Sequence, residues 1–186
     1  MIKILLGFAP WIVYFLLIGP KTSQIETAVI AAIITFLAVD LKALKRGFIL
    51  AWGTMLFLVF MLIVTFLFNH NWVTEHPWII SNGALGVIAF GSLIIKKPFT
   101  LQYAKLEVEK SKWSSPVFYR INFLLSLYWG LIFAFATLVH IVKLFHPEVS
   151  NIIYSSLSNG ATILGIIITA KFPQWYRQRS KQHAQS

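Results

Sequence analysis

Residues 48–68 read FILAWGTMLFLVFMLIVTFLF, a stretch without a single charged side chain. About 20 mostly apolar residues are enough for an α-helix to cross the hydrocarbon core of a bilayer. Because a helix satisfies its backbone hydrogen bonds internally, it is the structure expected for such a stretch in lipid. The segment therefore predicts a membrane-spanning helix, with which the rest of the chain can be compared.

Five other stretches share this Leu-, Ile-, Phe- and Ala-rich character. The first of them is short and contains Pro10, so it is expected to cross the membrane either completely or only in part. It lacks the small-residue cleavage site of a signal peptide, so we expect it to be retained. With 48–68 included, the six expected helices are Ile4–Ile18, Ile25–Leu41, Phe48–Phe68, Pro77–Ile95, Ile121–Phe145 and Ile152–Ala170.

The composition of the chain indicates the same class. Of its 186 residues, 58% are hydrophobic and 12% are charged, whereas roughly 25% are charged in an average soluble domain. A soluble fold of this size could not bury so much apolar surface. We therefore expect an all-α, polytopic integral membrane protein with a single transmembrane domain over residues 1–186. The absence of cysteine excludes disulfides, thiol redox chemistry and Cys-ligated zinc.

The basic residues predict an orientation. If six helices cross the membrane and the N-terminus is cytoplasmic, 14 of the 16 Lys and Arg residues fall on the cytoplasmic side, and only Lys21 and Lys143 lie outside. This bias follows the positive-inside rule, so both termini are expected in the cytoplasm. The net charge of +10 is then explained by topology and by contact with anionic lipid. We expect no nucleic-acid partner, since no basic domain stands clear of the membrane.

The last four expected helices contain a sequence repeat. The tetrapeptide SNGA occurs at 81–84 and again at 158–161, a shift of 77 residues, and the same shift places Trp52-Gly53 on Trp129-Gly130. One shift that links two separate motifs is hard to obtain from biased composition alone. We predict two parallel helical hairpins related by an axis along the membrane normal. The repeat units are expected at about 44–95 and 121–172, on either side of a cytoplasmic loop at 96–120.

The two SNGA turns form the first candidate site, and we expect them to face each other at similar depth in the outer half of the bilayer. In one interpretation, Asn82 and Asn159 clamp helices together, while Gly83, Gly160 and Gly165 allow close approach. In the other, they form a polar spot in a groove that binds a lipid head group or a small solute. Two tryptophans of the repeat complete the site and are expected near the cytoplasmic interface as anchors. The candidate residues are Ser81, Asn82, Ser158, Asn159, Trp52 and Trp129.

The loop at 96–120 carries the second candidate surface. Four of its residues fall on one helical face: Phe99, Tyr103, Leu106 and Trp113. One interpretation is an interfacial helix lying in the plane of the membrane, or a docking surface for a partner. The other is a solvated connector with a few anchoring aromatic residues.

Few ionisable residues fall inside the expected spans, where they would be functional candidates. His140 lies near the outer end of the fifth helix, and we favour an interfacial position for it over a role in proton transfer. Asp40 is expected to cap a helix or to pair with Lys42. The sequence has no metal-ligand spacing, Ser-His-Asp order, Walker loop or dinucleotide signature. We therefore expect a non-enzymatic protein without a metal or another cofactor.

The layout of the chain resembles the intracellular septation protein A family, small inner-membrane proteins of Gram-negative bacteria. The resemblance covers most of the chain, in length, order of segments and loop placement. It is carried by Phe8-Ala9-Pro10, the basic turn at 42–46, the helix end FLFNH at 66–70 and Lys96-Lys97-Pro98, while residues 98–104 mark a divergent member. The resemblance implies a bacterial inner (plasma) membrane protein that supports envelope maintenance and septation. Its implied partners are membrane lipids and other inner-membrane envelope or division proteins.

Two functions are therefore expected. The first is a non-enzymatic envelope and septation factor, which rests on the resemblance. The alternative is a protein that binds or transports a lipid or a small solute in a groove between the two hairpins, which rests on the paired asparagines. A homodimer is compatible with the thin core of a chain of 186 residues.

Overall fold

The computed structural model describes residues 2–19, 21–68 and 72–183, and all elements in these ranges are helical. The last two residues of the FLFNH segment lie outside these ranges. The order along the chain is α1 (Ile2–Gly7), α2 (Ala9–Leu17), α3 (Thr22–Val39), α4 (Leu41–Lys45), α5 (Ile49–Leu67), α6 (Trp72–Glu75), α7 (Pro77–Ile94), α8 (Phe99–Ala104), η1 (Lys110–Lys112), α9 (Pro116–Phe145) and α10 (Asn151–His183).

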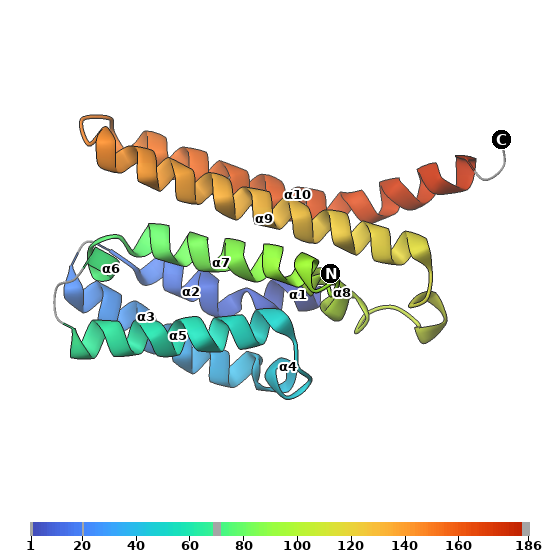
Figure 1. The fold of residues 1–186 in the computed structure, drawn as a ribbon, viewed down its shortest axis with the longest axis horizontal. Coiled ribbons are helices and arrows are strands. Elements are labelled where there is room, and N and C mark those ends of the chain that lie inside the picture. The colour runs from blue at the N-terminus through green and yellow to red at the C-terminus, as the bar shows by residue number, and fades with distance from the viewer. Residues whose placement is uncertain (1, 20, 69–71, 184–186) are drawn as a thin grey trace.

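Five of these helices, α3, α5, α7, α9 and α10, are long and apolar enough to cross a membrane. They correspond to the second through sixth expected spans. The all-helical character is confirmed for the described residues, and the five helices are compatible with a multi-pass membrane protein. The long helices run side by side (Figure 1). At a rise of about 1.5 Å per residue, α9 and α10, with 30 and 33 residues, are longer than the roughly 30 Å hydrocarbon core. Both are therefore long enough to extend beyond that core.

The first apolar stretch is divided into two short helices. α1 ends at Gly7 and α2 begins at Ala9, with Pro10 in the first turn of α2, where its missing N–H removes no helical hydrogen bond. α2 packs against α3 and inserts Trp11, which is 2% exposed and donates from Nε1 to Thr54 Oγ1 at 2.7 Å. The expected continuous helix is therefore broken near Phe8, and a complete crossing by this segment stays a prediction.

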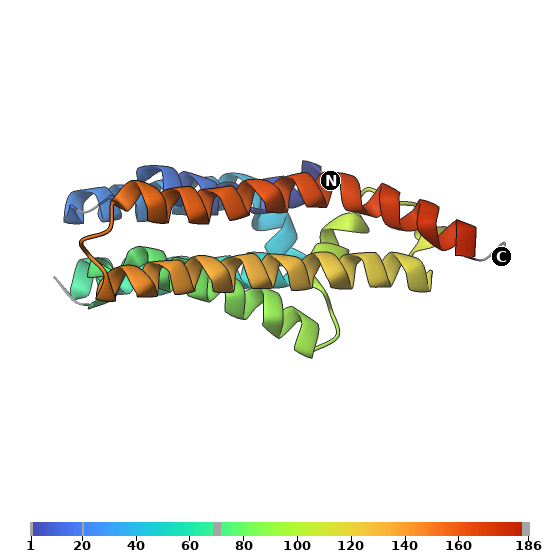
Figure 2. The ribbon, with the colours of Figure 1, turned by 90° about the horizontal axis from the view of Figure 1, so that it is seen from above.

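The long helices form two layers (Figure 2). One layer holds α10 with the N-terminal helices α2 and α3, the other holds α9, α7 and α5, and α4 connects the two. The most extensive helix pair is α7 with α9, whereas the main partner of α10 is α9. Within the two hairpins, α10 packs more extensively on α9 than α7 packs on α5. The hairpins α5–α7 and α9–α10 are therefore not packed alike. The internal duplication stays a prediction from the sequence.

Many of the basic segments lie at one end of the molecule. α4, α8, the residues that follow α8 and the C-terminal part of α10 are together at the right of Figure 1. The opposite end holds α6 and the connection from α9 to α10. This arrangement is compatible with the predicted orientation, in which the first of these two ends is cytoplasmic.

Candidate functional site

A cavity of about 300 Å³ lies between the N-terminal helices, α7, α9 and α10. α7 contributes Asn82 to its wall, and α10 contributes Ser158 and Asn159. The structure therefore brings the two SNGA turns to one cavity, although they are far apart in the sequence. Ser81 is fully buried instead, and its hydroxyl donates to the carbonyl oxygen of Pro77 in the same helix.

The two asparagine side chains have different surroundings. Asn82 is 7% exposed, and its Nδ2 donates to the carbonyl oxygen of Trp78, one turn earlier in α7, at 2.9 Å. Asn159 is exposed, and its side chain makes no hydrogen bond with any residue that the structure describes. Neither amide links two helices, as the clamping interpretation would require. One free amide therefore faces the cavity.

Aromatic side chains from the N-terminal segment form the opposite wall. Phe8 lies on α9 with its ring centroid 5.1 Å from that of Trp129, and Phe15 stacks on Trp78 of α7 at 5.3 Å. Trp11 also lines the cavity. The sequence analysis did not predict this aromatic wall. Positions 8, 11 and 15 follow the spacing of one helical face, and this spacing is the signal in the sequence that could have indicated it.

His140 of α9 belongs to the polar part of the cavity. Its side chain is 8% exposed, its Nε2 lies 3.4 Å from Ser158 Oγ, and its ring stacks on Trp78 at 5.6 Å. It therefore lies inside the helix bundle. The polar groups come from α7, α9 and α10, with Thr162 one turn beyond Ser158, while the N-terminal helices supply aromatic and aliphatic side chains. The cavity is amphipathic.

Trp52 and Trp129 do not occupy equivalent positions. Trp52 is 46% exposed and donates from Nε1 to the carbonyl oxygen of Leu44 at 3.1 Å. Trp129 is 3% exposed, lines the cavity, and donates to Thr169 Oγ1 of α10 at 3.0 Å. An interfacial anchor is compatible with Trp52 alone. Trp129 instead links α9 to α10.

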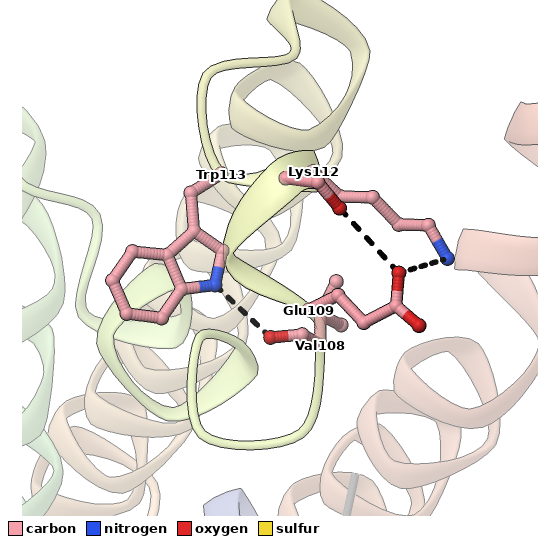
Figure 3. A network of polar contacts seen from close by, with 5 residues as sticks. Val108, Glu109, Lys112 and Trp113 are labelled. Carbon is pink, nitrogen blue, oxygen red and sulfur yellow. Dashed lines mark hydrogen bonds and ion pairs between the residues drawn. The ribbon is translucent and has the colours of Figure 1, made fainter.

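The 96–120 segment differs from the expected aromatic surface. Phe99 and Tyr103 of α8 are 1% and 3% exposed and belong to the core, and Leu106 packs against it. Trp113 is half-buried and donates from its indole nitrogen to the Val108 carbonyl oxygen at 3.0 Å (Figure 3). These four side chains therefore do not form one exposed aromatic face. Phe99, Tyr103 and Leu106 pack the segment against the core, whereas the hydrogen bond of Trp113 stays within the segment.

Comparison of the chain with protein-family models, with curated proteins and with solved structures gives no match. The fold and the cavity define the class on their own: a multi-pass helical membrane protein with an amphipathic cavity between its helices.

Proposed function

We propose that this protein is a membrane-embedded binding protein for an amphipathic molecule, either a lipid or a small polar solute. Its groove is the cavity lined by both SNGA turns. The observation that carries the proposal is the position of Asn82 and Asn159 on this one cavity, with the Asn159 amide lacking a partner among the described residues.

The chemistry of the walls supports this ligand class. The exposed side chain of Asn159 has no hydrogen-bond partner among the described residues. A ligand hydroxyl, amine or phosphate group beside it can therefore bond to its amide. The aromatic wall of Phe8, Trp11 and Phe15 suits an apolar body. The volume of about 300 Å³ lies at the lower end of the usual range for ligand pockets, about 300–1,000 Å³.

The test is native mass spectrometry of the protein purified in mild detergent. We expect one copurified molecule per chain in the wild type and its loss in Asn159→Leu. Because Asn159 makes no hydrogen bond within the described chain, leucine there removes no internal bond, and the fold should be retained. Asn82→Leu and the double variant extend the series, with helix content measured by circular dichroism.

The matched control is Asn151→Leu, which changes the same residue type at the start of α10, away from the cavity lining. It should keep the bound molecule. A wild-type spectrum without any copurified molecule, or equal loss from the control and from Asn159→Leu, would contradict the proposal.

A role in envelope maintenance and septation is retained as a second proposal, and it rests on the family resemblance. It includes the bacterial inner membrane as location, cytoplasmic termini, and partners among envelope or division proteins. A groove that holds a membrane lipid is compatible with such a role. Deletion of the gene followed by microscopy of dividing cells tests it, and normal septation in the deletion strain would count against it.

A further inference from the structure

A second cavity, of about 400 Å³, lies at the end of the molecule that holds α8. Its walls come from α1, α8, the residues after α8, α9 and α10. Trp129 lines the first cavity and Thr169 lines the second, so their hydrogen bond lies between the two. The second cavity is thus a separate site with its own lining residues.

The interior of this cavity is mainly apolar, although the hydroxyl of Tyr103, which also lines it, has no hydrogen-bond partner among the described residues. Its deep wall includes the buried side chains of Ile4, Ile121 and Leu125. The hydroxyl of Thr100 donates to the carbonyl oxygen of Asn122 at 2.8 Å, and the hydroxyl of Thr169 already accepts the Trp129 indole N–H. A hydrocarbon chain fits such an interior, since it needs no hydrogen-bond partner.

The mouth of the cavity is cationic. Lys112 and Arg177 line it and are exposed. Arg177 donates from Nε to the carbonyl oxygen of Pro173 at 2.9 Å, and its terminal nitrogens have no partner among the described residues. Lys112 Nζ lies 3.7 Å from a carboxylate oxygen of Glu109 (Figure 3). That ion pair is exposed and therefore weak. Lys112 can therefore leave Glu109 and pair with a phosphate group instead.

Basic groups outnumber acidic ones in the lining of the cavity. Lys112 and Arg177 are the basic lining residues, and Glu107 is the acidic one. Glu107 accepts a hydrogen bond from the backbone N–H of Lys3 at 2.9 Å. Phosphate oxygens match the guanidinium of Arg177 well, because arginine can donate two parallel hydrogen bonds to them.

From the apolar interior and the cationic mouth, we propose that this cavity binds one anionic phospholipid, with an acyl chain inside and the phosphate between Lys112 and Arg177. Basic pockets between membrane helices are a known way to hold anionic head groups. The site would lie in the leaflet that faces the cytoplasm in the predicted orientation.

The experiment is a native mass spectrometry titration in mild detergent with dioleoylphosphatidylglycerol or dioleoylphosphatidylcholine. We expect the wild type to bind one phosphatidylglycerol per chain more tightly than phosphatidylcholine. Lys112→Gln combined with Arg177→Gln should weaken phosphatidylglycerol binding roughly tenfold, or about 1.4 kcal/mol. Added salt should weaken it as well, because the mouth is open to solvent.

The matched control is Lys110→Gln with Arg179→Gln, which removes the same charge from the same two elements at positions that do not line the cavity. It should bind phosphatidylglycerol as the wild type does. Equal affinity for the two lipids, equal weakening by the control, or equally tight binding of glycerol phosphate without acyl chains would overturn the proposal. Asn159→Leu should leave this titration unchanged, which separates it from the test of the first cavity.

Discussion

Asp40 lies at the junction of α3 and α4 and is 2% exposed. Its side chain caps neither helix and makes no ion pair with Lys42 or any other described residue, so neither expected contact forms. Its Oδ2 is buried without a hydrogen-bond partner, as is the hydroxyl of Tyr103. Burial raises the pKa of Asp40 to about 7. Burial and the nearby Asp40 charge also raise the pKa of Tyr103. The folded protein therefore favours the neutral form of Asp40.

This preference predicts a pH-dependent stability. Between pH 4 and 7 the unfolded chain loses the Asp40 proton while the folded protein keeps it, so stability falls as pH rises through this window and is level above it. From pH 5.5 to 8 the loss should be about 2 kcal/mol, at about 1.36 kcal/mol per pKa unit. Thermal unfolding in detergent measures it.

Asp40→Asn is the control variant, since it stays neutral at every pH. The stability of this variant should not show the loss between pH 4 and 7 that Asp40 causes. At pH 8 the variant should therefore be more stable than the wild type. Because the two proteins differ only at position 40, the difference between the two curves isolates Asp40. Parallel curves would show that Asp40 is solvated in the folded protein.

At the residue scale, the sequence indicated side-chain types but not their neighbours. The SNGA repeat correctly singled out two asparagines that reach one cavity, yet it could not show that Asn82 bonds within its helix while Asn159 has no partner among the described residues. The difference arises because α7 lies inside the bundle, whereas α10 packs mainly on α9. The contacts of His140 with Trp78 and Ser158 could not be predicted from the sequence, because they depend on tertiary structure.

At the scale of elements, α10 approaches α9 closely at Gly165. A Cβ atom at Gly165 would lie 2.7 Å from Ile132 Cδ1 and 3.1 Å from the ring of Trp129. A Cβ atom at Gly160, in the same helix, would meet nothing within 4 Å. The sequence grouped both as small residues for helix packing, but only Gly165 lies at the α9 contact.

We therefore predict that Gly165→Ala destabilises the α9–α10 pair by about 1–3 kcal/mol, the usual cost of overpacking. Gly160→Ala should be neutral or slightly stabilising, since alanine favours helix more than glycine. Thermal unfolding followed by circular dichroism compares the two. Equal effects of both substitutions would show that α10 does not rest on α9 in this register.

The long helices could be predicted because lipid imposes a simple rule on length and polarity. The 96–120 segment could not, because its structure depends on distant partners. α8 is held by the bonds of Thr100 to Asn122 and Ser126 of α9, and its aromatic residues face the core as a result. A helical-face pattern alone does not distinguish a face turned inward from one turned to a partner.

For the whole molecule, the central prediction is orientation. The cysteine-free chain allows single-cysteine labelling in intact cells with a maleimide that does not cross membranes. Lys110→Cys, in the 96–120 segment, should be protected, while Glu148→Cys, between α9 and α10, should react. Both positions are exposed, so burial does not account for protection. The opposite pattern would place the termini outside.

One consequence of the fold concerns time. α10 is the last element described and forms one wall of both cavities, but its main support is α9. At a synthesis rate of about 5–20 residues per second, its 33 residues take roughly 2–7 seconds to make. Until α10 has been made and packs against α9, both cavities lack the wall that α10 supplies. The two cavities therefore form in the same step.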